Sequence, residues 1–107
     1  MVKSIVHRGP DDLGVHLFGP VGLGHTRLSI LDLSEHGHQP MHSEAERVTL
    51  VYNGEIYNHR ELREELLAAG RMFTGHSDSE TLLHAYCHWG IDCLERIHGM
   101  FAFAIWD

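Results

Sequence analysis

The feature that most constrains the fold is the segment 48–58 (VTLVYNGEIYN), where a β-favouring apolar run leads into Asn-Gly and then into a helix-like sequence. Asn-Gly adopts positive φ readily, so we expect the backbone to turn sharply at Asn53 and Gly54. Two interpretations of this turn stand side by side. It is either an ordinary hairpin turn, or a turn that aims the Asn53 amide and the Gly54 N–H at one point, where they can stabilise an oxyanion.

The other expected elements favour a single domain of the α+β class. Helices are expected to begin after Asn58 and after Ser77, because Glu61 and Glu80 follow three residues later in the pattern of a capping box. The remaining expected elements are a β-hairpin (13–18 and 21–30), a loop (32–43), a short helix (92–97) and an apolar strand (100–106). Strands, then helices, then a strand, without regular βαβ alternation, indicate a sheet packed against helices.

Composition excludes several classes of function. The formal net charge of −7 argues against a nucleic-acid partner, because phosphate binding requires a basic surface. No apolar run approaches the roughly 20 residues that span a bilayer. Two cysteines are too few for a disulfide framework, and no secretory signal is present, so we expect a cytoplasmic protein. The 11 histidines lack the spacing of a metal motif, and no metal site is predicted.

Three polar features stand out against apolar surroundings. Arg27 offers a planar fork that suits a carboxylate, although strand alternation alone allows a solvated outward side chain. Asp78 suits an ammonium group, although an acid at a helix start is also favourable for the helix dipole. Together with the amide of Asn53 and the N–H of Gly54, these groups can hold an α-amino acid at both charged ends while its side-chain carbonyl is attacked.

Several segments resemble the signatures of class II glutamine amidotransferase domains, and most of all the amidotransferase part of glutamine-dependent asparagine synthetase. The matching segments are 7–12 (HRGPDD), 24–30 (GHTRLSI), 39–41 (QPM), 53–58 (NGEIYN), 77–80 (SDSE) and 99–107 (GMFAFAIWD). The resemblance covers nearly the whole chain, and we expect residues 1–107 to form one partial domain of this type. It implies an N-terminal-nucleophile hydrolase-like αββα sandwich, here incomplete at both ends. It also implies hydrolysis of the glutamine side-chain amide to glutamate and ammonia.

The resemblance also implies a role for each site residue. Arg27 holds the α-carboxylate of glutamine, and Asp78 holds its α-ammonium group. Asn53 and Gly54 form the oxyanion hole, and Glu55 lines the site. The adjoining wall of the pocket is formed by Leu28, Ser29, Ile30 and Leu31.

The family's nucleophile, a cysteine at the N-terminus whose own α-amine acts as the base, is absent from this sequence. Cys87 and Cys93 are expected in helices, and neither offers a free α-amine, so we expect the chain alone to be inactive. The synthetase domain of the full-length relatives, which uses ATP and magnesium to convert aspartate to asparagine, is the expected partner besides glutamine. No cofactor is expected in the chain itself, and a homo-oligomer is left open as a further assembly. The alternative is a non-catalytic remnant that acts as a binding or assembly module.

Overall fold

The computed structural model describes residues 12–18, 21–27, 39–43 and 45–107. Its elements, in chain order, are β1 (Asp12–Phe18), β2 (Val21–Arg27), β3 (Met41–Ser43), β4 (Val48–Ile56), α1 (His59–Ala68), α2 (Asp78–Trp89), the 3-10 helix η3 (Gly90–Glu95) and β5 (Gly99–Trp106). Among the described residues, no helix combines the length and the apolar character that crossing a membrane requires.

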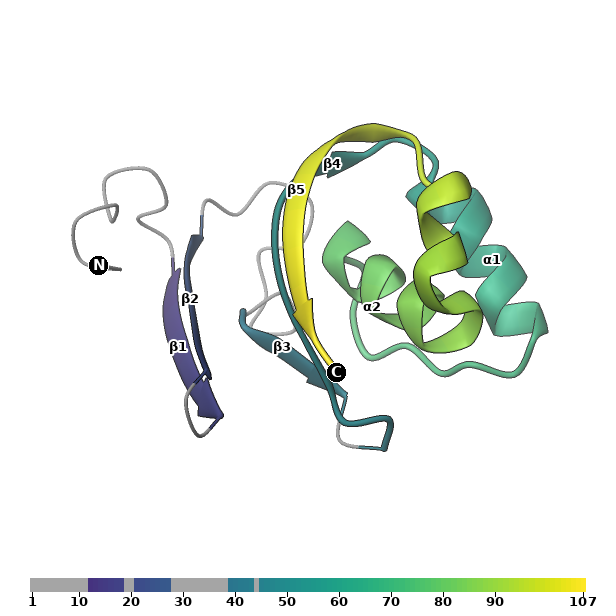
Figure 1. The fold of residues 1–107 in the computed structure, drawn as a ribbon. Helices are drawn as coiled ribbons and strands as arrows, with labels where there is room; N and C mark the ends of the chain where they lie inside the picture. Colours follow the sequence, from purple (N-terminus) through teal and green to yellow (C-terminus); the bar gives the residue numbers. More distant parts are fainter. Residues whose placement is uncertain (1–11, 19–20, 28–38, 44) are drawn as a thin grey trace.

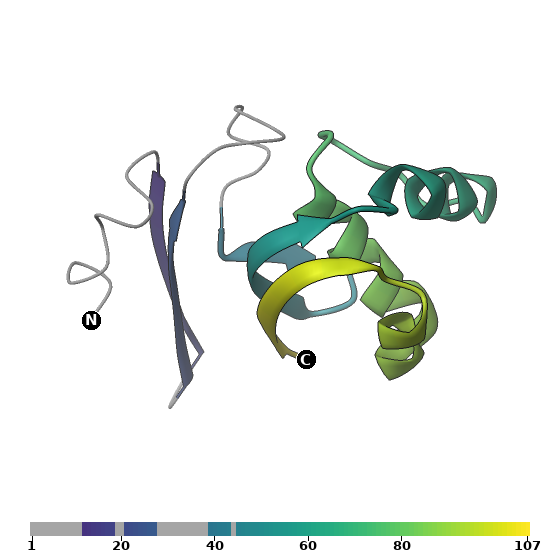
Figure 2. The same ribbon diagram turned by 90° about the horizontal axis from the view of Figure 1, so that it is seen from above.

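The described elements form three layers. β1 and β2 pair as an antiparallel hairpin, which confirms the hairpin expected from the sequence, and β3, β4 and β5 form an antiparallel sheet in that order. α1 and α2 cover one face of the three-stranded sheet, and the β1–β2 hairpin lies on its other side (Figures 1 and 2). β2 contacts β4 across the interface between the sheets. The expected α+β class is therefore confirmed.

The core lies between β4 and the helices. Successive side chains of a strand point to opposite faces, and in β4 the residues Val48, Leu50, Tyr52 and Ile56 are all buried. The helices meet them with a set of buried apolar side chains: Leu62, Leu66, Leu82, Leu83 and Ala85. The alternate positions of β4 face the β1–β2 hairpin. Of these, Thr49 is buried, whereas Asn53 and Glu55 are exposed.

The prediction of a sharp turn at Asn53 and Gly54 is wrong. β4 continues through both residues to Ile56, and Gly54 pairs with Phe101 in β5. Gly54 has φ +144°, and a Cβ placed there would lie 2.2 Å from the carbonyl oxygen of Met100. Glycine is therefore needed because β5 approaches the backbone closely, not because the chain reverses. Residues 41–43, expected within a loop, form β3 instead.

The two predicted helix caps have different outcomes. Ser77 caps α2 as expected, because its Oγ accepts a hydrogen bond from the Glu80 N–H at 3.2 Å. Asn58 makes no side-chain cap on α1. Its Nδ2 donates to the carbonyl oxygen of Arg96 at 2.8 Å, and its Oδ1 accepts from the N–H of His98 at 2.9 Å. Asn58 thus ties the start of α1 to the segment that enters β5.

The short helix expected at 92–97 is a 3-10 helix that begins two residues earlier. The change of helix type changes which side chains point inward, because a 3-10 helix has three residues per turn. Cys93 and Ile97 are buried, whereas Leu94 is 46% exposed.

Candidate active site at the open edge of strand β4

Asp78 is a buried carboxylate that docks on the backbone of β4. It is the first residue of α2, and only 6% of its surface is exposed. Its Oδ2 accepts hydrogen bonds from the phenol of Tyr52 at 2.5 Å and from the N–H of Ile56 at 3.0 Å. Within the described part of the chain, both hydrogen bonds to this carboxylate fall on Oδ2. A buried carboxylate needs such donors, because an unpaired charge in the interior is costly.

The N–H of Ile56 is available to Asp78 because β3 covers only the first part of β4. The β3–β4 pairing ends at Leu50, so the edge of β4 beyond that residue has no neighbouring strand among the described residues. The N–H of Tyr52 is the next one along this edge, and Gln39 takes it: Oε1 accepts from it at 2.5 Å. Two side chains thus replace β3 along the rest of the strand.

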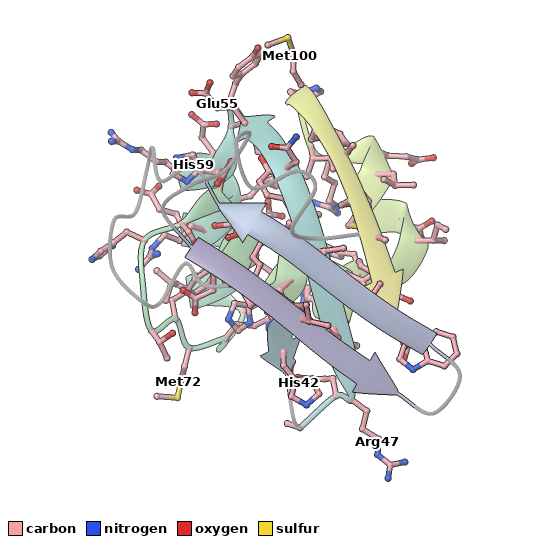
Figure 3. All side chains as sticks on the ribbon, turned by 90° about the vertical axis from the view of Figure 1, so that its left-hand side faces the viewer. His42, Arg47, Glu55, His59, Met72 and Met100 are labelled. Carbon is pink, nitrogen blue, oxygen red and sulfur yellow. The ribbon has the colours of Figure 1, made fainter. Side chains whose placement is uncertain are left out.

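Gly54 lies between these two hydrogen-bonded positions. In an antiparallel sheet the N–H groups of alternate residues point to the same edge. The N–H of Gly54 is therefore expected to point to the same edge as those of Tyr52 and Ile56. Asn53 and Glu55 carry the exposed side chains on either side of it. Figure 3 shows Glu55 and Met100 at the same end of the sheet, in agreement with their pairing in the β4–β5 register.

Glu80 fixes the loop that leads into Asp78. Its buried carboxylate accepts hydrogen bonds from the N–H groups of Thr74 at 2.7 Å and Gly75 at 2.8 Å. Burial acts to raise the pKa of Glu80, but the hydrogen bonds from His84 and from these N–H groups outweigh it and lower the pKa. Glu80 thus stays ionised and anchors the connection between α1 and α2.

The structure brings together the predicted site residues Asp78, Asn53, Gly54 and Glu55, because Asp78 bonds the backbone directly after Glu55. Arg27 is the last residue of β2, paired with Asp12, and its side chain lies outside the described part of the chain. The end of β2 lies toward the same end of the molecule as the C-terminal half of β4 (Figures 1 and 3). The predicted pocket wall of Leu28, Ser29, Ile30 and Leu31 lies outside the described residues.

Sequence reasoning missed two residues that contact this edge. Tyr52 was counted only as part of an apolar strand, and Gln39 only as part of a matching segment. A tyrosine at a buried strand position is itself a signal, because a buried phenol needs a hydrogen-bond partner. Among the described residues, no group of three or more histidine, cysteine, aspartate or glutamate side chains is arranged to hold a metal ion.

The two cysteines belong to other elements than β4, and the chemical environment of their thiols does not favour the nucleophilic form. Cys87 is in α2 and Cys93 in η3, and both are free thiols. Burial is the largest cause that raises the pKa of each thiol. A raised pKa disfavours the thiolate, which is the nucleophilic form. Neither side chain has the environment of an activated nucleophile.

Comparison with known proteins matches the sequence of this chain to one family. The model of the glutamine amidotransferase domain matches residues 1–107. Asparagine synthetase 3 (glutamine-hydrolysing) of Bacillus subtilis is 45% identical over 109 residues, covering 100% of this chain and 18% of that protein. Asparagine synthetase 1 (glutamine-hydrolysing) of the same organism is 49% identical over 107 residues, covering 100% of this chain and 17% of that protein.

A solved structure agrees with the sequence relatives. Glutamine phosphoribosylpyrophosphate amidotransferase from B. subtilis, complexed with ADP and GMP, superimposes with a TM-score of 0.66 at 26% identity. The match covers 79% of this chain and 20% of that one. The fold is thus that of an N-terminal-nucleophile hydrolase-like sandwich, as the sequence led us to expect.

The class that the fold and site define is an amidotransferase-type α+β domain. The chain belongs to the glutamine amidotransferase domain family. It spans less than a fifth of the length of the two B. subtilis relatives. Membership of this family favours the amidotransferase hypothesis over that of a binding or assembly module.

Proposed function

We propose that the chain binds L-glutamine at the open edge of β4, as the glutaminase part of a glutamine-dependent asparagine synthetase. The observation that carries this proposal is the buried Asp78 carboxylate, held against the backbone of β4 directly after Glu55. A carboxylate in this position can receive the α-ammonium group of an amino acid. The primary amide of the same amino acid then reaches toward Asn53 and Gly54.

The spacing along β4 supports a ligand of this size. Ile56 and Gly54 are two residues apart, so their N–H groups lie roughly 7 Å from each other along the strand. Asp78 bonds the N–H of Ile56, and the N–H of Gly54 would be the oxyanion donor together with the Asn53 amide. The α-ammonium and the side-chain carbonyl of one glutamine molecule can span this interval. Arg27, at the end of β2, would pair with the α-carboxylate, next to a wall formed by residues 28–31.

The ammonia released from glutamine would serve a synthetase domain that converts aspartate to asparagine with ATP and magnesium. Both the product and this partner domain are proposed from the relatives, which are glutamine-hydrolysing asparagine synthetases. The expected cytoplasmic location is proposed from the sequence, whose two cysteines are too few for a disulfide framework.

We further propose that a polypeptide of this sequence binds glutamine without hydrolysing it. The reaction requires a cysteine thiolate activated by a neighbouring base. Cys87 and Cys93 have raised pKa values and carry no α-amine. Glutamate release from glutamine is therefore expected to equal that of a blank without protein. Turnover well above the blank would contradict this part of the proposal.

Titration calorimetry with L-glutamine tests the binding proposal. Arg27→Ala is expected to weaken binding by about tenfold or more, because a charge-assisted contact to the α-carboxylate is lost. Arg60→Ala, the same substitution at an exposed position of α1, is the matched control and is expected to bind as the unmodified chain does. Equal binding by both variants would refute the assignment of Arg27, and absence of glutamine binding by the unmodified chain would refute the proposed function.

A further inference from the structure

Tyr52 makes a buried contact that the proposed function does not use. Its side chain is 4% exposed, on the face of β4 that meets the helices. Its phenol donates to Oδ2 of Asp78 at 2.5 Å, and the N–H of Ile56 donates to the same oxygen at 3.0 Å. Both donors meet one oxygen of the carboxylate, and they approach it from two residues of the same strand.

We propose that Tyr52 is a positioning residue that fixes the Asp78 carboxylate so that its second oxygen, Oδ1, is presented to the α-ammonium group of the ligand. Gln39 supports it by holding the backbone of Tyr52. This inference rests on the proposed function and adds to it the origin of the selectivity for an α-amino acid over the same molecule without its amino group.

Two donors on one oxygen remove the rotational freedom that an aspartate otherwise has. The last torsion of an aspartate side chain is broad and roughly two-fold, so a carboxylate held by one donor can rotate. A carboxylate at the first position of a helix also has competing donors nearby, because the N–H groups of the first turn have no partner within the helix. With Tyr52 and Ile56 both on Oδ2, the plane of the carboxylate is set, and Oδ1 keeps its orientation before the ligand arrives. Such preorganisation increases affinity by lowering the ordering cost of binding.

The phenol is suited to this task over a wide pH range. Burial is the largest cause that raises the pKa of Tyr52, and the hydrogen bond to Asp78 raises it further. The hydroxyl therefore keeps its proton throughout the neutral range. A protonated phenol facing an ionised carboxylate makes a charge-assisted hydrogen bond, which is stronger than one between neutral groups.

Gln39 fixes the position of Tyr52 along the strand edge. It is 6% exposed, and its Oε1 accepts from the N–H of Tyr52 at 2.5 Å. β3 ends its pairing at Leu50, so without Gln39 this buried N–H would lose its partner among the described residues. An unpaired buried N–H is costly, and the strand would shift to relieve it. Gln39 therefore holds the backbone of Tyr52, and Tyr52 in turn holds the carboxylate of Asp78.

A pair of ligands separates positioning of Asp78 from a general effect on the fold. L-glutamine has the α-ammonium group, and 4-carbamoylbutanoate is the same molecule without it. Calorimetry on the 107-residue chain measures the affinity for each. We expect Tyr52→Phe to weaken glutamine binding by about tenfold, the loss of one charge-assisted hydrogen bond, and to leave the binding of 4-carbamoylbutanoate unchanged.

The matched control is Tyr86→Phe. It removes the same hydroxyl from α2, where the phenol of Tyr86 donates to the exposed Asp107 at 3.0 Å. Neither ligand is expected to bind differently to this variant. If Tyr52→Phe does not fold, as judged by circular dichroism, Gln39→Met carries the test. It removes the acceptor at similar side-chain volume, and it is expected to weaken glutamine binding selectively.

The outcomes distinguish this inference from the function on which it rests. If the unmodified chain binds glutamine and Tyr52→Phe binds it equally well, the positioning role is overturned and the proposed function stands. If Tyr52→Phe, or Gln39→Met in its place, weakens both ligands by the same factor, the residue is structural and the inference is overturned. If the unmodified chain binds no glutamine, the proposed function fails, and the inference fails with it.

Discussion

Gly54→Ala tests the close approach of β5 to β4, the strand that carries the candidate site. The added Cβ would lie 2.2 Å from the carbonyl oxygen of Met100 and 2.5 Å from the Cα of Phe101. Both are backbone atoms, so the contact can be relieved only by moving a strand. The alanine would also have to keep φ near +144°, a backbone conformation that residues other than glycine rarely adopt.

The expected cost is the sum of two effects. An unfavourable φ of this kind costs about 1–3 kcal/mol. Forcing an extra carbon into a packed site costs about 1–3 kcal/mol more. We therefore expect Gly54→Ala to lower the free energy of unfolding by about 2–6 kcal/mol, a large part of the roughly 5–15 kcal/mol typical of a domain.

Gly70→Ala separates the two effects, because Gly70 also has positive φ, +96°, but no atom of the described residues, apart from its chain neighbours, lies within 4 Å of the added Cβ. This control is expected to cost only the backbone strain, about 1–3 kcal/mol. Urea unfolding followed by circular dichroism gives the free energy of unfolding for each variant. If Gly54→Ala costs no more than Gly70→Ala, the close packing of β5 on Gly54 is not a constraint, and this explanation of the glycine is wrong.

Three further predictions concern stability. Asn58→Ala is expected to lower the free energy of unfolding by about 1–3 kcal/mol in urea titrations, because it loses two hydrogen bonds, one of them to Arg96; Asn58→Ser, which can cap α1, should not restore the loss. The folded-state pKa of Glu80 is lowered, so its contribution to stability is present above the unfolded pKa, near 4.5, and is lost as pH falls through the folded value. Glu80→Gln should therefore be less stable than the unmodified chain at pH 7, with a difference in Tm that shrinks in acid. Leu66→Ala, at a fully buried position, is expected to cost about 2–5 kcal/mol. Leu67→Ala, at a position 45% exposed, should cost far less, and equal losses would contradict the orientation of α1.

The sequence predicted most elements because their signals are local. Alternation across a Gly-Pro pair predicted the β1–β2 hairpin, and the serine of the SDSE segment predicted the start of α2 at Asp78. The prediction of a turn at Asn53 and Gly54 was wrong, because Gly54 takes its positive φ within a strand. The pairing of Gly54 with Phe101, 47 positions later in the chain (101 − 54), cannot be found from the dipeptide itself.

The same limit applies to the site. The resemblance to a known family predicted Asp78, Asn53, Gly54 and Glu55 as site residues, and the structure brings these residues together on and beside β4. The resemblance assigned no role to the residues that hold them. Tyr52 reaches Asp78 across 26 positions of the chain, and Gln39 reaches Tyr52 across 13. Contacts of this kind depend on the tertiary fold and leave only a weak signal in a single sequence, such as a tyrosine at a buried position.

The period of two in β4 explains how one short segment can serve both stability and binding. At even positions, the side chains of Tyr52 and Ile56 enter the core, while their N–H groups bond Gln39 and Asp78 at the strand edge. At odd positions, Asn53 and Glu55 place polar side chains on the opposite face. A slip of one residue would exchange the two sets, burying an amide and a carboxylate and exposing the apolar side chains. The burial that stabilises the register of β4 therefore also sets the geometry of the candidate site.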